Sequence, residues 1–163
     1  MSKEYLTFTL DGSQYAAEVY KVQEVLEYTK ITKVPCAASY VEGLINSRGQ
    51  GISVVNLRKK FAMTDVEPGK DTRIIVFEIS GENGVTPFGA IADSVQEVIG
   101  LDDAEVEGAP RFGNTVAERF IRGIGKKDGA FIIILDIDKI FTEDEAEALE
   151  QAASSAPLET QAT

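Results

Sequence analysis

The residues whose chemistry is most suggestive form the tetrapeptide Asn-Ser-Arg-Gly at 46–49, which lies between two apolar segments. A guanidinium beside a glycine in a turn is well presented for bidentate hydrogen bonds to a carboxylate or carbonyl group of another chain. The alternative is that Arg48 forms an ion pair within its own chain, for instance with Glu24 or Glu42. The residues alone leave these two interpretations open.

Elsewhere the sequence does not indicate an assembled catalytic site. The chain has no histidine, the commonest general base and zinc ligand, so its single cysteine, Cys36, has no histidine to activate it. Carboxylates beside expected strands, at Asp93, Asp136 and Asp138, are interpreted as helix caps or solvated strand edges. The glycines of 123–125 lack the further glycine and the long helix of a dinucleotide site. We therefore expect no enzyme activity, no cofactor and no metal.

Charge and hydropathy limit the classes of partner. A net charge of −11 disfavours nucleic acid and anionic membrane, because both favour basic patches. No segment approaches the roughly 20 apolar residues of a membrane span, and the polar start indicates no signal segment. A single cysteine cannot form an internal disulfide and fits a reducing compartment. The expectation is a cytoplasmic protein without direct membrane insertion.

An internal repeat organises the chain into two similar halves. Val-Gln-Glu-Val at 22–25 occurs again at 95–98, which is 73 residues later. Two further matches follow at an offset of 80 residues. The matched segments are 22–25 with 95–98, 40–43 with 120–123, and 56–61 with 136–141. Three matches in the same order indicate that both halves contain the same elements.

The hydrophobic pattern predicts many short strands. Residues 5–10 alternate apolar and polar with a period of two, as a half-buried strand does, and Asp11-Gly12 is a hairpin-turn signal. Further strands are expected at 15–19, 44–46, 52–57, 73–79, 88–92 and 130–135. The pattern favours a mostly β fold of two small barrels over a parallel α/β sheet.

A few short helices are also expected. Residues 20–26 can form one with its apolar side chains on one face, and 37–41 can form a helical turn that ends at Gly43. Thr142 with Glu145 three positions later is a capping-box signal for a terminal helix.

Several motifs match one known family in order and spacing. They lie at 21–25, 41–43, 46–49 and 54–58 in the first half, and at 89–98 and 135–141 in the second. Together they resemble the CheW family of bacterial chemotaxis coupling proteins, over about Glu4 to Phe141. The resemblance implies two tandem SH3-like, five-stranded β-barrel subdomains that share a hydrophobic core, with short helices and a C-terminal helix.

The expected organisation of the chain follows from the repeat and the resemblance. It comprises a domain at 4–141, with a first subdomain at about 4–64, a linker at 64–72 and a second subdomain at about 73–141, then a C-terminal helix at 142–154 and a disordered tail at 155–163.

By this resemblance, the protein would be a non-catalytic scaffold that couples methyl-accepting chemoreceptors to the histidine kinase CheA. The receptor's helical-hairpin tip would lie in a groove between the barrels. The matching positions there are Val22, Glu24, Gly43, Arg48 and Gly49. The regulatory domain of the kinase would contact a barrel end, loosely 112–122, and the candidate residues there are Phe112, Arg119, Phe120 and Arg122. Copies of the chain could also contact one another in arrays, which receptors would recruit to the inner face of the membrane.

The sequence departs from the family near the proposed receptor surface. Ser47 replaces a leucine, Ser53 a proline and Asn56 an aspartate, whereas the arginine and the glycine after it are kept. We therefore expect partner choice to differ from the best-known systems. Two other functions remain open at this point: an adaptor for a related kinase outside chemotaxis, or a small-molecule-binding β barrel with a deep, closed, polar pocket.

Overall fold

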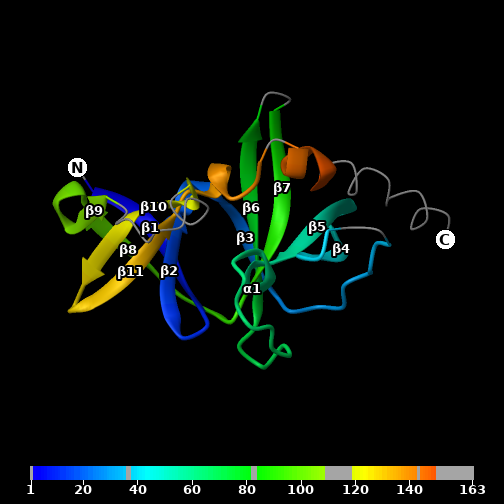
Figure 1. Ribbon diagram of the computed structural model, residues 1–163, viewed down its shortest axis with the longest axis horizontal. Helices are drawn as coiled ribbons and strands as arrows, with labels where there is room; N and C mark the ends of the chain where they lie inside the picture. Colours follow the sequence, from blue (N-terminus) through cyan, green and yellow to red (C-terminus); the bar gives the residue numbers. More distant parts are fainter. Residues whose placement is uncertain (1, 36–37, 82–83, 109–118, 143, 150–163) are drawn as a thin grey trace.

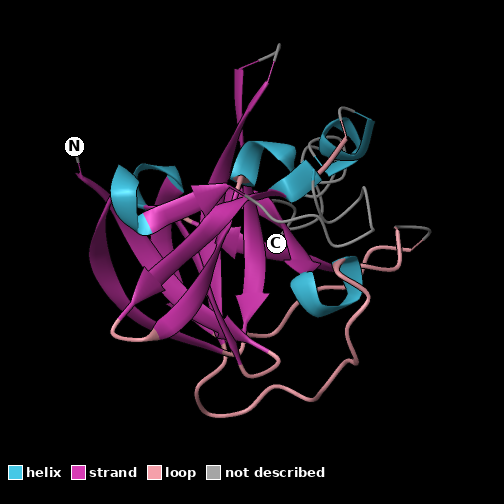
Figure 2. Cartoon of the chain, turned by 60° about the vertical axis from the view of Figure 1, so that its left-hand side comes forward, coloured by secondary structure: helices cyan, strands magenta, loops and turns pink. Residues whose placement is uncertain are grey.

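The chain forms two β sheets with short helices around their margins (Figure 2). The computed structural model describes residues 2–35, 38–81, 84–108, 119–142 and 144–149. One sheet contains β1 (Ser2–Leu10), β2 (Ser13–Glu18), β8 (Ser94–Asp102), β9 (Val106–Gly108), β10 (Ile121–Lys127) and β11 (Ala130–Leu135). The other contains β3 (Val22–Glu27), β4 (Val41–Ser47), β5 (Gln50–Asn56), β6 (Arg73–Gly81) and β7 (Gly84–Ala92). The short helices are η1 (Val19–Lys21), α1 (Leu57–Lys60), η2 (Asp103–Glu105) and η3 (Ile137–Lys139). The predicted mostly β fold is confirmed.

The two sheets have equivalent strand orders. The first runs β8-β1-β2-β11-β10-β9 and the second β3-β6-β7-β5-β4 (Figure 1). They differ by the three-residue strand β9, which pairs with β10 and gives the first sheet a sixth strand. In each sheet, a central hairpin pairs in parallel with the next hairpin, β2 with β11 and β7 with β5. The sequence repeat therefore corresponds to a structural repeat.

Each half of the chain contributes its first hairpin to the other half's sheet. Hairpin β1–β2 lies among β8 to β11, and hairpin β6–β7 lies among β3 to β5 (Figure 1). The boundary at 64–72 thus divides the sequence repeat but does not divide the sheets. This exchange makes the two sheets one folding unit, because neither is complete without the other half.

The exchanged hairpins pack on each other in one hydrophobic core. Phe8 of β1 and Phe77 of β6 are both fully buried, with ring centroids 6.4 Å apart. Phe88 of β7 packs edge-on against Phe141, with centroids 5.1 Å apart. Burying each such ring contributes roughly 1.5–3 kcal/mol. A core shared between the two sheets is therefore the main source of stability.

Two ion pairs fasten the exchanged hairpins in place. Arg58 Nη2 lies 2.6 Å from Asp93 Oδ2, and the same carboxylate oxygen accepts the amide of Asp11 in the β1–β2 turn at 2.8 Å. Lys21 Nζ lies 2.8 Å from Asp138, which also accepts an amide of β6 at 2.9 Å. Arg58 and Asp138 occupy equivalent positions of the repeat, so the structure keeps the bridge and reverses its polarity.

Two of the predicted helices are wrong. Most of 20–26 lies in β3, whose side chains alternate between inner and outer faces, and only Val19–Lys21 form a single 3-10 turn. Val41 and Gly43 lie inside β4, and residues 38–40 are not helical. In both places strand pairing decides the structure, because β3 bonds to β6 and β4 to β5.

Other local predictions are confirmed. Asp11 and Gly12 have φ values of 52° and 81°, as a two-residue hairpin turn requires. The capping box at the terminal helix is present, because Glu145 accepts the amide of Thr142 at 2.8 Å and donates its own amide to the Thr142 hydroxyl at 3.1 Å. Residues 144–149 are helical. The rest of the expected helix, to 154, and the expected tail at 155–163 lie outside the described residues.

Candidate docking site

The proposed receptor residues gather where the two edges of the five-stranded sheet meet. β3 and β4 are the outermost strands of this sheet, yet Ser47 at the end of β4 donates a hydrogen bond of 3.0 Å to Glu24 Oε2 in β3. Arg48 Nη2 lies 3.5 Å from Glu24 Oε1. The sheet therefore curls until its edges come together, and Glu24 joins them.

Arg48 stands on the two-residue turn between β4 and β5. Its φ is 55°, and the Asn46 side chain accepts the amide of Gly49 at 2.9 Å, which closes the turn. The Arg48 side chain is 84% exposed although it pairs with Glu24. Both interpretations from the sequence thus hold in part. Glu42, the other candidate partner, pairs instead with Lys59 at 3.0 Å.

Gly43 supports the site from beneath. It lies at a register shift between β4 and β5, with φ of 147°, and the segment before β4 crosses close above it. Thr32 and Leu44 exchange two backbone hydrogen bonds, of 2.9 and 2.7 Å, across this crossing. A Cβ at Gly43 would overlap the carbonyl oxygen of Thr32. The glycine is needed for close backbone approach.

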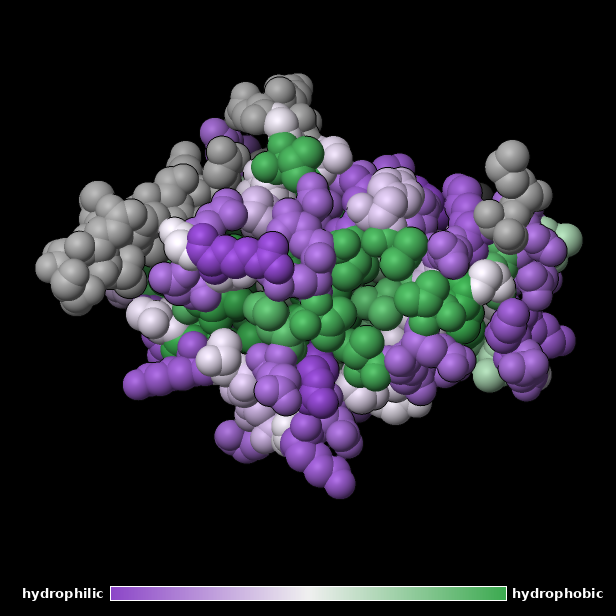
Figure 3. Space-filling view, turned by 180° about the vertical axis from the view of Figure 1, so that it is seen from behind, coloured by the Kyte–Doolittle hydropathy of each residue, from purple (hydrophilic) through white to green (hydrophobic). Residues whose placement is uncertain are grey.

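Val22 is half-buried and packs against the shared core, so it anchors the start of β3. The outward-facing apolar groups nearby are Tyr20, 68% exposed, and Val25, 41% exposed. Sequence analysis missed both as surface residues because it placed them in a helix. The period-two alternation of 22–27 is the signal that could have found Val25. Apolar side chains also gather in a band across the face opposite to that of Figure 1 (Figure 3).

The four kinase candidates do not form one surface among the described residues. Phe112 lies outside those residues, and Arg119 is exposed. Phe120 is buried and stacks on Phe61 with centroids 4.5 Å apart. Arg122 pairs with the buried Glu18. Phe120 therefore belongs to the core, and Arg122 holds a buried carboxylate while its own side chain is 39% exposed.

The carboxylates singled out in the sequence are occupied by cations of the chain. Asp93 accepts two hydrogen bonds from Arg58, and Asp138 accepts one from Lys21. Partial burial raises the pKa of Asp93, but the bonds from Arg58 and the Asp11 amide outweigh burial and hold this pKa below its ordinary value. Such pairing serves to fasten segments together, and it leaves these groups ill suited to proton transfer.

A second carboxylate fastens the terminal helix. Glu145 accepts hydrogen bonds from Lys60 at 2.8 Å and from the Tyr40 hydroxyl at 2.9 Å. Burial raises the pKa of Glu145, but the bonds from Lys60, the Thr142 amide and Tyr40 lower it overall to about 2. At the far end of the described helix, the buried hydroxyl of Ser53 donates to the carbonyl of Leu149 at 2.9 Å. Among the described residues, no helix combines the length and apolar character that a membrane crossing requires.

Two β sheets interlocked by exchanged hairpins, with an exposed arginine turn and an apolar surface band, define a small β scaffold suited to binding other proteins. Comparison with known proteins agrees. Residues 4–145 match the CheW-like domain family. The chain is 33% identical to the chemotaxis protein CheW of Thermotoga maritima over 86% of this chain and 88% of that protein. It is 29% identical to CheW of Klebsiella aerogenes, over 95% of this chain and 91% of that protein.

Solved structures give the same result. The crystal structure of the scaffolding protein TtCheW from Thermoanaerobacter tengcongensis matches with a TM-score of 0.79 and 35% sequence identity. The match covers 89% of this chain and 96% of that one. The chain belongs to the CheW family of chemotaxis scaffold proteins.

Proposed function

We propose that this protein is a non-catalytic adaptor of bacterial chemotaxis, which holds a methyl-accepting chemoreceptor and the histidine kinase CheA in fixed geometry. It acts in the cytoplasm, at the inner face of the membrane, where the receptors recruit it. A shift in the receptor then alters the kinase through the adaptor, because the adaptor binds one state of the assembly better than the other.

The observation that carries the proposal is the Arg48 turn in a member of this family. A guanidinium that is 84% exposed, on a rigid two-residue turn, is a preorganised donor for a carboxylate or carbonyl of a partner. Tyr20 and Val25 offer apolar surface beside it, and tyrosine and arginine are the residues that most often dominate binding energy at interfaces. The receptor tip is the partner that we assign to this surface.

The kinase regulatory domain is assigned to the other sheet, near the start of β10. Arg119 is the exposed candidate there, and Arg122 contributes with the part of its side chain that remains accessible. The two partners thus bind different sheets, which permits both to be bound at once. Contacts between copies of the chain within an array are compatible with this arrangement.

The test is a pull-down with a chemoreceptor cytoplasmic fragment and the kinase regulatory domain, each alone and both together. We expect each to bind alone, and the immobilised kinase domain to retain the receptor fragment only when the adaptor is present. Arg48→Ala should abolish receptor retention and leave kinase binding intact. Lys126→Ala, which removes an exposed cation of β10, is the matched control. Retention of the receptor without the adaptor, or no binding of either partner, would overturn the proposal.

A further inference from the structure

The repeat provides a second copy of the Arg48 turn in the other sheet. The turn between β10 and β11 consists of Asp128 and Gly129, which are 80 residues after Arg48 and Gly49. The φ values match closely, at 51° and 80° against 55° and 82°. The two turns are thus the same structural element. They differ in charge, because an aspartate stands where the first turn has an arginine.

The strand that faces each turn is also repeated. Glu24 of β3, which meets Arg48, has its counterpart in Glu97 of β8, 73 residues later. In the first sheet the glutamate therefore faces a guanidinium from its own chain, at 3.5 Å. In the second sheet the equivalent turn position, Asp128, supplies a second carboxylate instead. The structure keeps one half of this ion pair twice and supplies the other half once.

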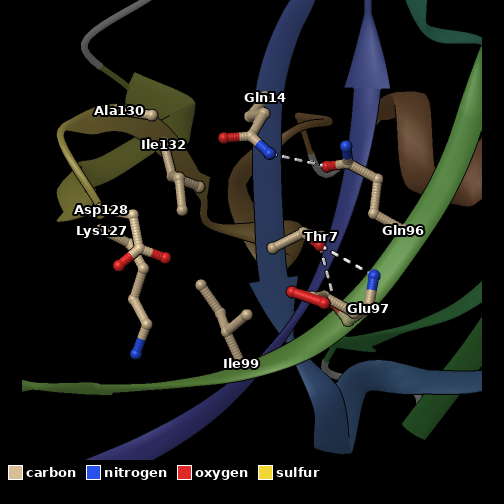
Figure 4. A pocket seen from close by; sticks show the side chains of 9 residues that line it. All are labelled: Thr7, Gln14, Gln96, Glu97, Ile99, Lys127, Asp128, Ala130 and Ile132. Atoms are coloured by element: carbon tan, nitrogen blue, oxygen red, sulfur yellow. Dashed lines mark hydrogen bonds between the residues drawn. The ribbon is translucent and has the colours of Figure 1, made fainter.

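A cavity of about 300 Å³ separates the second turn from β8. Figure 4 shows Lys127 and Asp128 on one side, Gln96 and Glu97 on the other, and the carboxylate of Glu97 directed into the space between them. Aliphatic side chains, Ile99 and Ile132 among them, complete the lining. In the first sheet the Ser47 hydroxyl and the Arg48 guanidinium bridge the corresponding gap.

The cation on the second turn is engaged elsewhere. Lys127 stands at the position equivalent to Ser47, and its Nζ donates to the carbonyl of Gly100 at 3.2 Å. Gln96 accepts a hydrogen bond from Gln14 at 2.9 Å, so the amide pair closes one end of the cavity. The side chains of Glu97 and Asp128 are both exposed and face the opening.

We propose that this cavity receives an arginine side chain from a partner protein. The guanidinium would lie between the carboxylates of Glu97 and Asp128, and its aliphatic stem would pack on Ile99 and Ile132. An arginine fits because a planar guanidinium can donate to two carboxylates at once while its stem covers apolar surface. The first sheet already shows a guanidinium beside the equivalent glutamate. This site does not depend on the coupling function proposed above.

The experiment uses the full ¹⁵N-labelled chain and the capped pentapeptide Asn-Ser-Arg-Gly-Gln, which copies residues 46–50. Amide chemical shifts in β8 and at 127–130 should move on titration. A peptide with citrulline in place of arginine keeps the shape and removes the charge, and it should bind at least about tenfold more weakly. Glu97→Gln with Asp128→Asn should weaken arginine-peptide binding by a similar factor. Asparagine tolerates the positive φ at 128, so the fold should be preserved.

Two further variants keep the result interpretable. Asp103→Asn with Glu107→Gln removes the same charge elsewhere on this sheet and should leave binding unchanged. Asp128→Arg recreates the first turn's ion pair and should block the cavity from within. The proposal is overturned if the citrulline peptide binds equally well, or if shifts arise away from β8 and 127–130. It is also overturned, in favour of a second copy as the occupant, if the chain self-associates and both Arg48→Ala and the double variant abolish that association.

Discussion

The hydroxyl of Ser47 donates a hydrogen bond of 3.0 Å to Glu24 Oε2, and this bond joins the two edge strands of the five-stranded sheet. Arg48 reaches the other oxygen of the same carboxylate only at 3.5 Å. Ser47 therefore holds Glu24 in place while Arg48 stays largely exposed. The family usually has a leucine at this position, so the chain carries its own means of setting the orientation of Glu24.

We therefore expect Ser47→Ala to weaken receptor-fragment binding about two- to fivefold, because the freed Glu24 can close on Arg48 and compete with the partner. Isothermal titration calorimetry measures the change. Ser47→Thr keeps a hydroxyl and should restore wild-type affinity. Equal affinity for all three proteins would show that Ser47 does not control the availability of Arg48.

Gly43→Ala should destabilise the protein by roughly 3 kcal/mol or more, because the added Cβ overlaps the Thr32 carbonyl and φ is positive. The unfolding midpoint by circular dichroism should fall by roughly 6 °C or more. Gly100→Ala is the matched control, since a Cβ there meets nothing within 4 Å. Similar melting of the two variants would contradict the close approach at Gly43.

Arg58→Ala should cost about 2 kcal/mol of unfolding free energy, because it leaves the partly buried Asp93 without its cation. Urea denaturation gives this value, and Lys126→Ala should change it by less than about 0.5 kcal/mol. Arg58→Lys should recover only part of the loss, since a lysine cannot make the bidentate contacts of 3.0 and 2.6 Å to Asp93. A neutral Arg58→Ala would mean that this bridge does not fasten the hairpins.

Acid should loosen the terminal helix through Glu145. Its pKa is about 2 in the folded protein against an ordinary 4.5, so its contribution to stability is fully present above pH 4.5 and is lost as the pH falls toward 2. The side chain is 27% exposed, so we expect a contribution of about 2 kcal/mol. Glu145→Gln should lower stability at pH 7 and reduce its fall between pH 4.5 and 2. An unchanged pH profile would contradict this role.

The strands and their turns could be predicted from the sequence, because alternation and Asp-Gly are local signals. Residues 20–26 could not, since Val22 and Leu26 are four apart and fit both the helical and the strand period. Pairing of β3 with β6, distant in sequence, settles the matter. The hairpin exchange was equally hidden, because a repeat states which elements each half contains and not which half they pair with.

The candidate site was predicted in part. The Arg48 turn followed from its glycine and its flanking apolar segments, and Glu24 was one of two partners considered for it. The burial of Phe120 against Phe61 depends on contacts between distant segments, which no local pattern indicates. The cavity beside Glu97 depends in the same way on the curl of the sheet.

The most direct test is calorimetric titration of a chemoreceptor cytoplasmic fragment into the wild-type chain, Arg48→Ala and Lys126→Ala. The account predicts that Arg48→Ala loses affinity by about tenfold or more, with an unfolding midpoint within about 2 °C of wild type, while Lys126→Ala binds normally. Wild-type affinity in Arg48→Ala would contradict the assignment of this turn as the receptor surface.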